Sequence, residues 1–311
     1  MSSLVKIGNT QIRVTGRLLR IARLEADGYI FLENPELFLS ELRRSKTRVD
    51  VFHFMPRLGQ SSAKYDYPTE MDNVAALPVS TFDEWWNNQI GFKARNKAKQ
   101  AEKKGVTVRE VPFDETLVRG IKEVYDESPV RQGAPNKHYG KPFETVYREE
   151  ATFLDNSIFI GAYLGESLIG FIKLVHDETK SQAGLMNIVS MVQHRDKAPT
   201  NALVAQAVRS CADRGIQHLV YSRFVYGKKQ ESSLIDFKER NGFQKIDLPR
   251  YYVPITKVGA VAVRYGLYKK LSEHVPEPVL ARLRELRSSF YGWKFKAGPK
   301  AAPESADQPA K

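Results

Sequence analysis

The segment 157–215 constrains the fold more than any other part of the chain, because its apolar pattern changes period in a definite order. Apolar runs over 158–163 and 168–174 flank a short polar turn that contains a glycine, and this pattern predicts a β-hairpin. A third apolar run, 185–192, predicts a strand, and the helical spacing of apolar residues over 201–212 predicts a helix. We therefore expect three strands in succession, then a polar loop, then a helix.

The polar loop 193–200 connects the third of these strands to the helix. The first N–H groups of a helix lack internal partners and the helix dipole is positive at that end, so such a loop suits an anionic ligand. Arg195 and Lys197 add charge of the matching sign. Taken singly, these features are explained as well by helix capping from Thr200 or Asn201. The arrangement as a whole favours an anion-binding site.

Further segments extend the order downstream. Residues 218–224 predict a fifth strand, 232–243 predict a helix closed by an Asn-Gly pair and a phenylalanine, and 244–255 predict a last strand pair. Between residues 82 and 256 this order resembles the acyl-CoA N-acyltransferase (GNAT) fold, and especially its FemAB-like branch, which includes BioF2-like acetyltransferases. The resemblance implies an α/β (α+β) fold with a mixed, mostly antiparallel central sheet flanked by helices.

The resemblance also implies a donor site along the third strand and the loop after it. It places the cofactor-binding residues at Val192, His194, Arg195, Lys197, Ala198, Thr200, Asn201 and Ala202. The pyrophosphate loop of the superfamily reads Arg/Gln-x-x-Gly-x-Gly/Ala, whereas residues 195–200 read Arg-Asp-Lys-Ala-Pro-Thr, so both small positions differ. FemAB-like members depart from that pattern too. The donor therefore stays open between an acyl-CoA, such as acetyl-CoA, and an aminoacyl-tRNA.

The loop 128–142 holds three prolines and two glycines together with polar side chains. The resemblance places it beside the acceptor site, where His138 would act as a general base and Arg131 would grip a carboxylate or phosphate. An ordered surface loop in which these side chains only fix the backbone explains the segment equally well. Further candidates for substrate binding are Gln132, Tyr139, Lys173 and Lys228.

The sequence departs most from the family at the position of the general acid. Many members carry a tyrosine four residues before the glycine of the Gly-Phe pair, and Lys238 occupies that place here. Tyr226, in the loop before the same helix, is a candidate to replace the missing hydroxyl. The alternative is a tyrosine that only packs in a turn. Lys238, Tyr226 and His138 are the catalytic candidates.

Composition limits the class of protein and of chemistry. With 311 residues, 42% hydrophobic and 27% charged, the chain is typical of a globular protein, and no apolar run reaches the roughly 20 residues of a membrane helix. There is no signal-peptide pattern, and the single cysteine, Cys211, lies on the apolar face of a predicted helix, so we expect a cytoplasmic protein with a buried, inert thiol. We expect no metal, and no nucleophile-elbow, Walker or dinucleotide motif occurs. Acyl or aminoacyl transfer to a small-molecule or peptide amine, by direct attack, is the chemistry that remains.

The net charge of +12 favours anionic partners without choosing among them. Residues 93–105 hold six basic residues and one acidic residue, which indicates either a solvated helical face or a phosphate-facing patch. Eleven basic and five acidic residues follow Thr256, in segments that predict basic amphipathic helices. These helices would pack on the domain or touch an acidic membrane.

Two other functions stay open: a catalytically degenerate protein that binds RNA or a partner, and a membrane-peripheral assembly protein. The oligomeric state is open as well.

The domain organisation follows from these shifts in composition. We expect strands at 11–14, 28–32 and 49–54, with a helix opened by Asn34-Pro35 between the last two, then a polar connection over 65–77. An edge strand is expected at 249–254, because Pro249 cannot donate to a ladder. The predicted units are a β-rich N-terminal domain at 1–80, the transferase domain at 81–256, a helical extension at 257–296 and a disordered tail at 297–311.

Overall fold

The computed structural model describes residues 2–59, 64–131, 134–226, 233–269 and 277–296. An eleven-stranded sheet runs through the molecule, and β7 (Val130–Arg131) and β8 (Ala134–Pro135) form a small second sheet. In sheet order the large sheet consists of β1 (Ser2–Ile7), β2 (Thr10–Thr15), β3 (Ile21–Leu24), β4 (Val51–Phe54), β13 (Gln244–Pro254), β5 (Thr69–Pro78), β12 (His218–Val220), β11 (Ala183–Ser190), β10 (Ser167–His176), β9 (Ser157–Leu164) and β6 (Val106–Val111).

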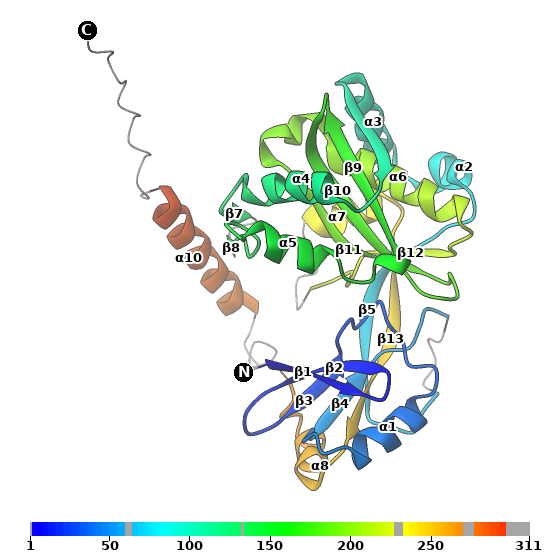
Figure 1. The fold of residues 1–311 in the computed structure, drawn as a ribbon, viewed down its shortest axis with the longest axis vertical. Coiled ribbons are helices and arrows are strands. Elements are labelled where there is room, and N and C mark those ends of the chain that lie inside the picture. The colour runs from blue at the N-terminus through cyan, green and yellow to red at the C-terminus, as the bar shows by residue number, and fades with distance from the viewer. Residues whose placement is uncertain (1, 60–63, 132–133, 227–232, 270–276, 297–311) are drawn as a thin grey trace.

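Helices cover the sheet in two groups (Figure 1). The first group flanks β9 to β12, and the second, smaller group flanks β1 to β4, while β5 and β13 run between the two halves. The α-helices are α1 (Pro35–Arg44), α2 (Phe82–Glu84), α3 (Phe92–Lys103), α4 (Glu115–Asp126), α5 (Phe143–Glu150), α6 (Pro199–Asp213), α7 (Ser233–Arg240), α8 (Lys257–Arg264) and α10 (Glu277–Lys296). None of the described helices is both long and apolar enough to cross a membrane.

Each face of the sheet has its own core. On one face α3 and α6, the latter through residues such as Leu203, pack against Ile160 and Ile172, and on the other α4 and α5 pack against Phe159 and Phe171. The single-residue alternation of β9 and β10 sends neighbouring side chains to opposite cores, which is why both strands are apolar almost throughout. The helix–sheet layers that the pattern of 157–215 predicted are confirmed.

The sheet divides between β11 and β12. These two parallel strands share only two residue pairs, Ala183 with Leu219 and Gly184 with Val220. Beyond them β11 continues to Ser190 and β12 ends, so the strands part and leave an opening in the sheet. The fifth strand predicted over 218–224 is correspondingly shorter.

Three local predictions are wrong for physical reasons. Residues 65–77 are no polar connection, because 74–77 are apolar and place β5 in the sheet between β12 and β13. The predicted strand pair over 244–255 is the single strand β13, whose partner β5 comes from far upstream. Residues 28–32 form no strand and hold only an isolated bridge from Asp27 to Ile30.

Pro249 lies inside the sheet and not at its edge. Tyr252 donates its N–H to Pro68 O on the β5 side, so alternation turns the nitrogen of residue 249 to the opposite side. There β4 begins to pair only at Tyr251, and the missing donor costs no ladder bond. The edge assignment at 249–254 is therefore wrong.

Helix boundaries follow capping chemistry in the first half of the chain. Asn34 Oδ1 accepts from Leu37 N at 3.0 Å, and Pro35 occupies the first turn of α1, as predicted. The basic run at 93–105 falls mainly on α3, which begins after Gly91 and is separated from α2 by a π-turn, Trp85–Gln89. Trp85 Nε1 donates to Asn241 O at 2.9 Å, and Gly91 N donates to Arg240 O at 2.8 Å, so this break is anchored to the end of α7.

Candidate functional site

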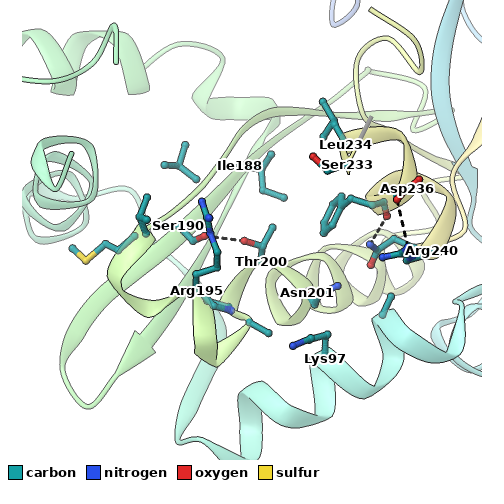
Figure 2. A pocket seen from close by; sticks show the side chains of 18 of the residues that line it. Lys97, Ile188, Ser190, Arg195, Thr200, Asn201, Ser233, Leu234, Asp236 and Arg240 are labelled. Carbon is teal, nitrogen blue, oxygen red and sulfur yellow. Dashed lines mark hydrogen bonds and ion pairs between the residues drawn. The ribbon is translucent and has the colours of Figure 1, made fainter. Parts of the chain in front are cut away.

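The opening between β11 and β12 leads into a cavity of about 900 Å³, called here the main cavity. It is lined by the end of β11, the loop and first turn of α6, the inner side of α7 and one side of α3 (Figure 2). These are the strand, loop and helix that the sequence singled out, joined by α3 and α7 from either side. A cavity of this size accommodates a cofactor-sized ligand.

The free edge of β11 supplies backbone donors to this cavity. Met191 N donates to Ile169 O at 2.8 Å, so residue 191 directs its polar groups toward β10. Alternation then directs the N–H groups of Ile188 and Ser190 away from β10, into the opening. Arg131 Nη1 donates to Ser190 O at 2.8 Å, which agrees with that orientation.

The N-terminus of α6 has no side-chain cap. The helix begins at Pro199, two residues earlier than the sequence indicated, and Ala198 stands at its N-cap position. Capping by Thr200 or Asn201 is therefore wrong: Thr200 Oγ1 hydrogen-bonds to Ser190 Oγ at 2.8 Å. Residues 198–201 line the main cavity. Pro199 has no N–H, and the N–H groups of Ala198 and Asn201 donate to Arg195 O and Ala198 O at 3.1 Å, so Thr200 N–H is the first-turn donor that remains for a ligand.

Ala198 has a φ of 53°, in the left-handed region that glycine adopts most readily. It occupies the first small position of the superfamily's loop pattern. The backbone turn is thus kept without glycine, at the cost of some strain.

Positive side chains surround the main cavity. Lys97 on α3, Arg195 on the loop and Arg240 on α7 reach it from three elements (Figure 2), and Lys93 and Arg131 line it as well. Among the described residues that line it, the acidic one is Asp236, which pairs with Arg240 at 3.4 Å. Only part of the basic run of α3 therefore faces the cavity, while residues such as Lys99 lie outside its lining.

The residues predicted to bind the donor fall into two groups. Val192, Arg195, Ala198, Thr200 and Asn201 line the main cavity. His194, Lys197 and Ala202 lie on the same loop and helix but outside the lining. Lys197 pairs with Asp196 at 3.4 Å, and Ala202 packs against the core of α6.

The candidates on the acceptor side are more dispersed. Arg131 lines the cavity, yet it also donates to Val124 O at 3.0 Å and pairs with Glu127 at 3.3 Å, while burial lowers its pKa. His138 lies outside the lining and stacks on Tyr125 at 4.2 Å between ring centroids. Burial and the charges of neighbouring lysines lower its pKa to about 4, so the ring is neutral at pH 7. Tyr139 is half exposed on the same loop, and Gln132 and Lys228 lie outside the described residues.

Lys173 belongs to a buried network behind α5. Its Nζ donates to Glu150 O at 2.7 Å and to Thr152 O at 2.6 Å, and burial lowers its pKa to about 8. The carboxylate of Glu150 accepts from Tyr125 at 2.8 Å and from Asn187 at 3.0 Å. Every group here has a protein partner, and Lys173 does not line the main cavity.

Lys238 and Tyr226 meet where β11 and β12 part. Lys238 is fully buried, donates to the carbonyl oxygens of Arg223 and Phe224, and has its pKa lowered to about 8 by burial. Its Nζ lies 4.9 Å from the ring centroid of Tyr221 and 4.7 Å from that of Tyr226. An ammonium over two ring faces holds both rings in place.

A third tyrosine completes this group. Burial, then the nearby Tyr226, raises the pKa of both Tyr29 and Tyr221 to about 12. Tyr29 donates to Leu185 O at 3.2 Å, and its ring occupies the space above Gly184, where an added Cβ would approach to 2.4 Å. We call Tyr29, Tyr221, Tyr226 and Lys238 the tyrosine cluster. The sequence missed Tyr29 and Tyr221, because residues so far apart leave no local signal.

A second cavity of about 540 Å³ begins on the other side of this cluster. Tyr29, Gly184 and Val220 line it, whereas Tyr221 lines the main cavity. The rest of its wall comes from β3, β4, β5 and β13, from the segments that follow β3, β4 and β12, and from Thr15, Gln182, Tyr268 and Lys269. Tyr221 and Tyr29 thus connect the tyrosine cluster to one cavity each, while Tyr226 and Lys238 line neither cavity.

Metal and thiol chemistry have little support at these positions. Within the described ranges, no group of three or more His, Cys, Asp or Glu side chains is placed to hold a metal ion. Cys211 is buried, and burial raises its pKa to about 12, so it remains protonated near neutral pH.

Comparison with known proteins identifies the fold. No protein-family model and no curated protein matches this sequence. The structure is similar to the C-terminal domain (DUF2156) of a putative lysylphosphatidylglycerol synthetase from Agrobacterium fabrum, with 15% identity, a TM-score of 0.56, and coverage of 85% of this chain and 87% of that chain. It is also similar to FemX (11%, TM-score 0.53, 80% and 87% covered) and to L-PGS from Bacillus licheniformis (12%, TM-score 0.53, 85% and 88% covered). The chain therefore has a GNAT-like fold, as its sequence predicted, and FemX is among its structural neighbours.

Proposed function

We propose that this protein is an acyl- or aminoacyltransferase that moves an acyl group from an activated ester or thioester to an amine. The observation that carries the proposal is the combination, in one positively charged cavity, of an uncapped helix N-terminus and a free strand edge. The first suits a phosphate-bearing donor, and the second suits an acyl carbonyl. The name of one structural neighbour, a lysylphosphatidylglycerol synthetase, agrees with this chemistry.

The donor would lie across the main cavity. Its phosphates would meet Arg195 and the first turn of α6, with Lys97 and Arg240 at the sides. Its acyl carbonyl would accept from the N–H groups of Ile188 and Ser190, which stabilise the oxyanion as the amine attacks. Both donors carry phosphates, an acyl-CoA at the far end of its pantetheine arm and an aminoacyl-tRNA on the nucleotide that bears the ester, so both remain candidate donors.

The tyrosine cluster would carry out the proton transfers of the reaction. The amine nitrogen bonds to the acyl carbon, the bond from that carbon to the donor's sulfur or oxygen breaks, and the leaving atom takes a phenol proton from the tyrosine cluster, in which Tyr221 lines the main cavity and Tyr226 lies across Lys238 from it. The proton lost by the amine restores the phenol through water. Lys238 acts as a positioning residue that holds the Tyr226 ring. His138 is the weaker candidate, because its ring is stacked on Tyr125 and neither it nor Tyr125 lines the main cavity or belongs to the tyrosine cluster.

A transfer assay tests the proposal. The full chain is incubated with acetyl-CoA, longer acyl-CoAs or aminoacyl-tRNA and a panel of amines, with mass spectrometry of the products. We expect one donor class to give product, and Tyr226→Phe to lower kcat with little change in the donor KM. Tyr139→Phe, a phenol outside both cavities, is the matched control. Failure of every donor to bind would overturn the proposal.

RNA binding without catalysis is the second candidate function. It is favoured by Ala198 and Thr200, which replace both small residues of the loop pattern, and by the basic lining of the main cavity. RNA affinity that falls steeply with salt, together with no binding of coenzyme A and no transfer from any donor, would decide for it.

A further inference from the structure

The second cavity lies on one face of the sheet, where side chains from distant strands are neighbours. Arg23 of β3 pairs with His53 of β4, and His53 pairs with Tyr252 of β13. Directly opposed residues project to the same face, so these three side chains form a row along the cavity. All three line it, and none belongs to the main cavity.

A buried arginine forms ion pairs with the aspartates that line this cavity. Arg250 is 8% exposed; its Nε donates to Asp72 at 3.0 Å and its Nη1 to Asp27 at 2.8 Å. Its Nη2 lies 3.0 Å from Met55 Sδ, so each nitrogen of its guanidinium has a partner. Asp72 also pairs with Arg223 at 2.7 Å. Both carboxylates of the cavity are therefore neutralised by the protein itself.

His53 presents a hydrogen-bond donor to the cavity. Arg250 Nη1 lies 3.0 Å from His53 Nδ1, and a guanidinium cannot accept, so Nδ1 is the acceptor. Burial, followed by the charge of Arg250, lowers the pKa of His53 to about 4. The neutral ring then carries its hydrogen on Nε2, and this N–H forms no hydrogen bond with the described residues.

Arg23 is the unmatched charge. Its guanidinium forms no ion pair or side-chain hydrogen bond within the part of the chain that the structure describes, although it lies close enough to His53 to influence its pKa. Together Arg23 and His53 offer donors with no acceptor, beside the aromatic side chains Tyr29 and Phe31. A concave site of this kind, apolar on one side with two convergent donors, suits a small anionic ligand.

We propose that the second cavity binds the acceptor through an oxyanion group, a carboxylate or phosphate, held by Arg23 and by the Nε2–H of His53. This assignment rests on the proposed transferase function, because it places the acceptor's amine at the tyrosine cluster, opposite the donor. The substrate class is then an amine that also carries an oxyanion. Tyr29, which lines this cavity and contacts the cluster, marks the path between them.

Direct binding tests the site without any need for catalysis. The probes are phosphoethanolamine and β-alanine, with ethanolamine as the matched amine that lacks an anion, measured by calorimetry on the full chain. Both anionic probes should bind more tightly than ethanolamine, and Arg23→Met should weaken their binding by about tenfold or more. Arg17→Met is the control, since Arg17 is exposed in the same half of the molecule and lines neither cavity.

The outcomes distinguish the oxyanion site from the transferase function, and a lipid head group from a free small molecule as the source of the anion. Equal binding of ethanolamine and phosphoethanolamine, or unchanged binding by Arg23→Met, would overturn the oxyanion site even if transfer is observed. Binding that depends on Arg23, without transfer from any donor, would keep the site and remove the transferase. Vesicles of phosphatidylethanolamine form a separate arm: binding that depends on Arg23 there but not with the free head group would assign the anion to a lipid.

Discussion

The two cavities flank the same split in the sheet, but they hold their charges in different ways. The main cavity uses backbone N–H groups and long basic side chains near its mouth, such as Lys97, which is exposed to solvent. The second cavity is built around Arg250, whose partners are fixed and buried. Exposed lysines and arginines adapt to a large, highly charged ligand, whereas a buried network pre-organises a small site.

This difference predicts which changes unfold the protein and which only weaken binding. Substitutions around Arg250 should act on the free energy of unfolding, because they leave charges buried without a partner. Substitutions of the main cavity's basic side chains should act on ligand affinity alone.

The largest effect is expected for Arg250→Met. It leaves Asp27 without its ion-pair partner and Asp72 with Arg223 alone, so it should lower the free energy of unfolding by about 3–5 kcal/mol. Urea denaturation measures the change. Arg223→Met, which removes a half-exposed partner of the same Asp72, should cost at most about 1 kcal/mol. Similar losses in the two variants would show that the second cavity is no more rigid than the surface.

The next effect concerns ligand affinity in the main cavity. The double variant Lys97→Ala, Arg195→Ala should weaken coenzyme A binding by about tenfold while the urea midpoint stays within error. Lys99→Ala, from the same basic helix but outside the lining, is the matched control. If the double variant still binds coenzyme A tightly, the phosphates of the ligand lie elsewhere, and the two cavities do not differ in the way described.

The sequence anticipated the main cavity and not the second one, and the reason is physical. The main cavity's β11, loop and α6 follow one another in the chain, so their polar loop and periodicity are visible as one pattern. The second cavity is assembled from β3, β4, β5 and β13, and no pattern within a single strand reveals which distant strands will pair. The same limit explains β5, whose insertion beside β13 is a long-range event, and Tyr29, which reaches Leu185 from a segment taken for a strand.

A smaller effect should appear in the pH dependence of stability. His138 has a folded pKa of about 4, below the ordinary value of 6.5, so the unfolded chain binds its proton first as the pH falls. The stability that the neutral His138 ring contributes is fully present above pH 6.5 and is lost as the pH falls from 6.5 to 4. At pH 5 the loss in free energy of unfolding is about 1 kcal/mol, a figure reduced to allow for the partial exposure of the ring. His138→Phe, which keeps a ring to stack on Tyr125, should lose less stability than the wild type between pH 7 and pH 5 in urea denaturation. Parallel losses would show that His138 titrates normally.

The smallest effect is expected at Ala198, a positive-φ residue in the lining of the main cavity. Alanine at a φ of 53° is disfavoured by about 1–2 kcal/mol, while glycine there costs about 0.5–1 kcal/mol of additional chain entropy, so Ala198→Gly should raise stability by about 0.5–1 kcal/mol. Thermal unfolding measures it, with Ala202→Gly inside α6 as a control that should lose stability by about 1 kcal/mol. If Ala198→Gly also tightens coenzyme A binding, the loop is limited by its backbone conformation. Unchanged binding would mean that the uncapped first turn of α6 is already in place without glycine.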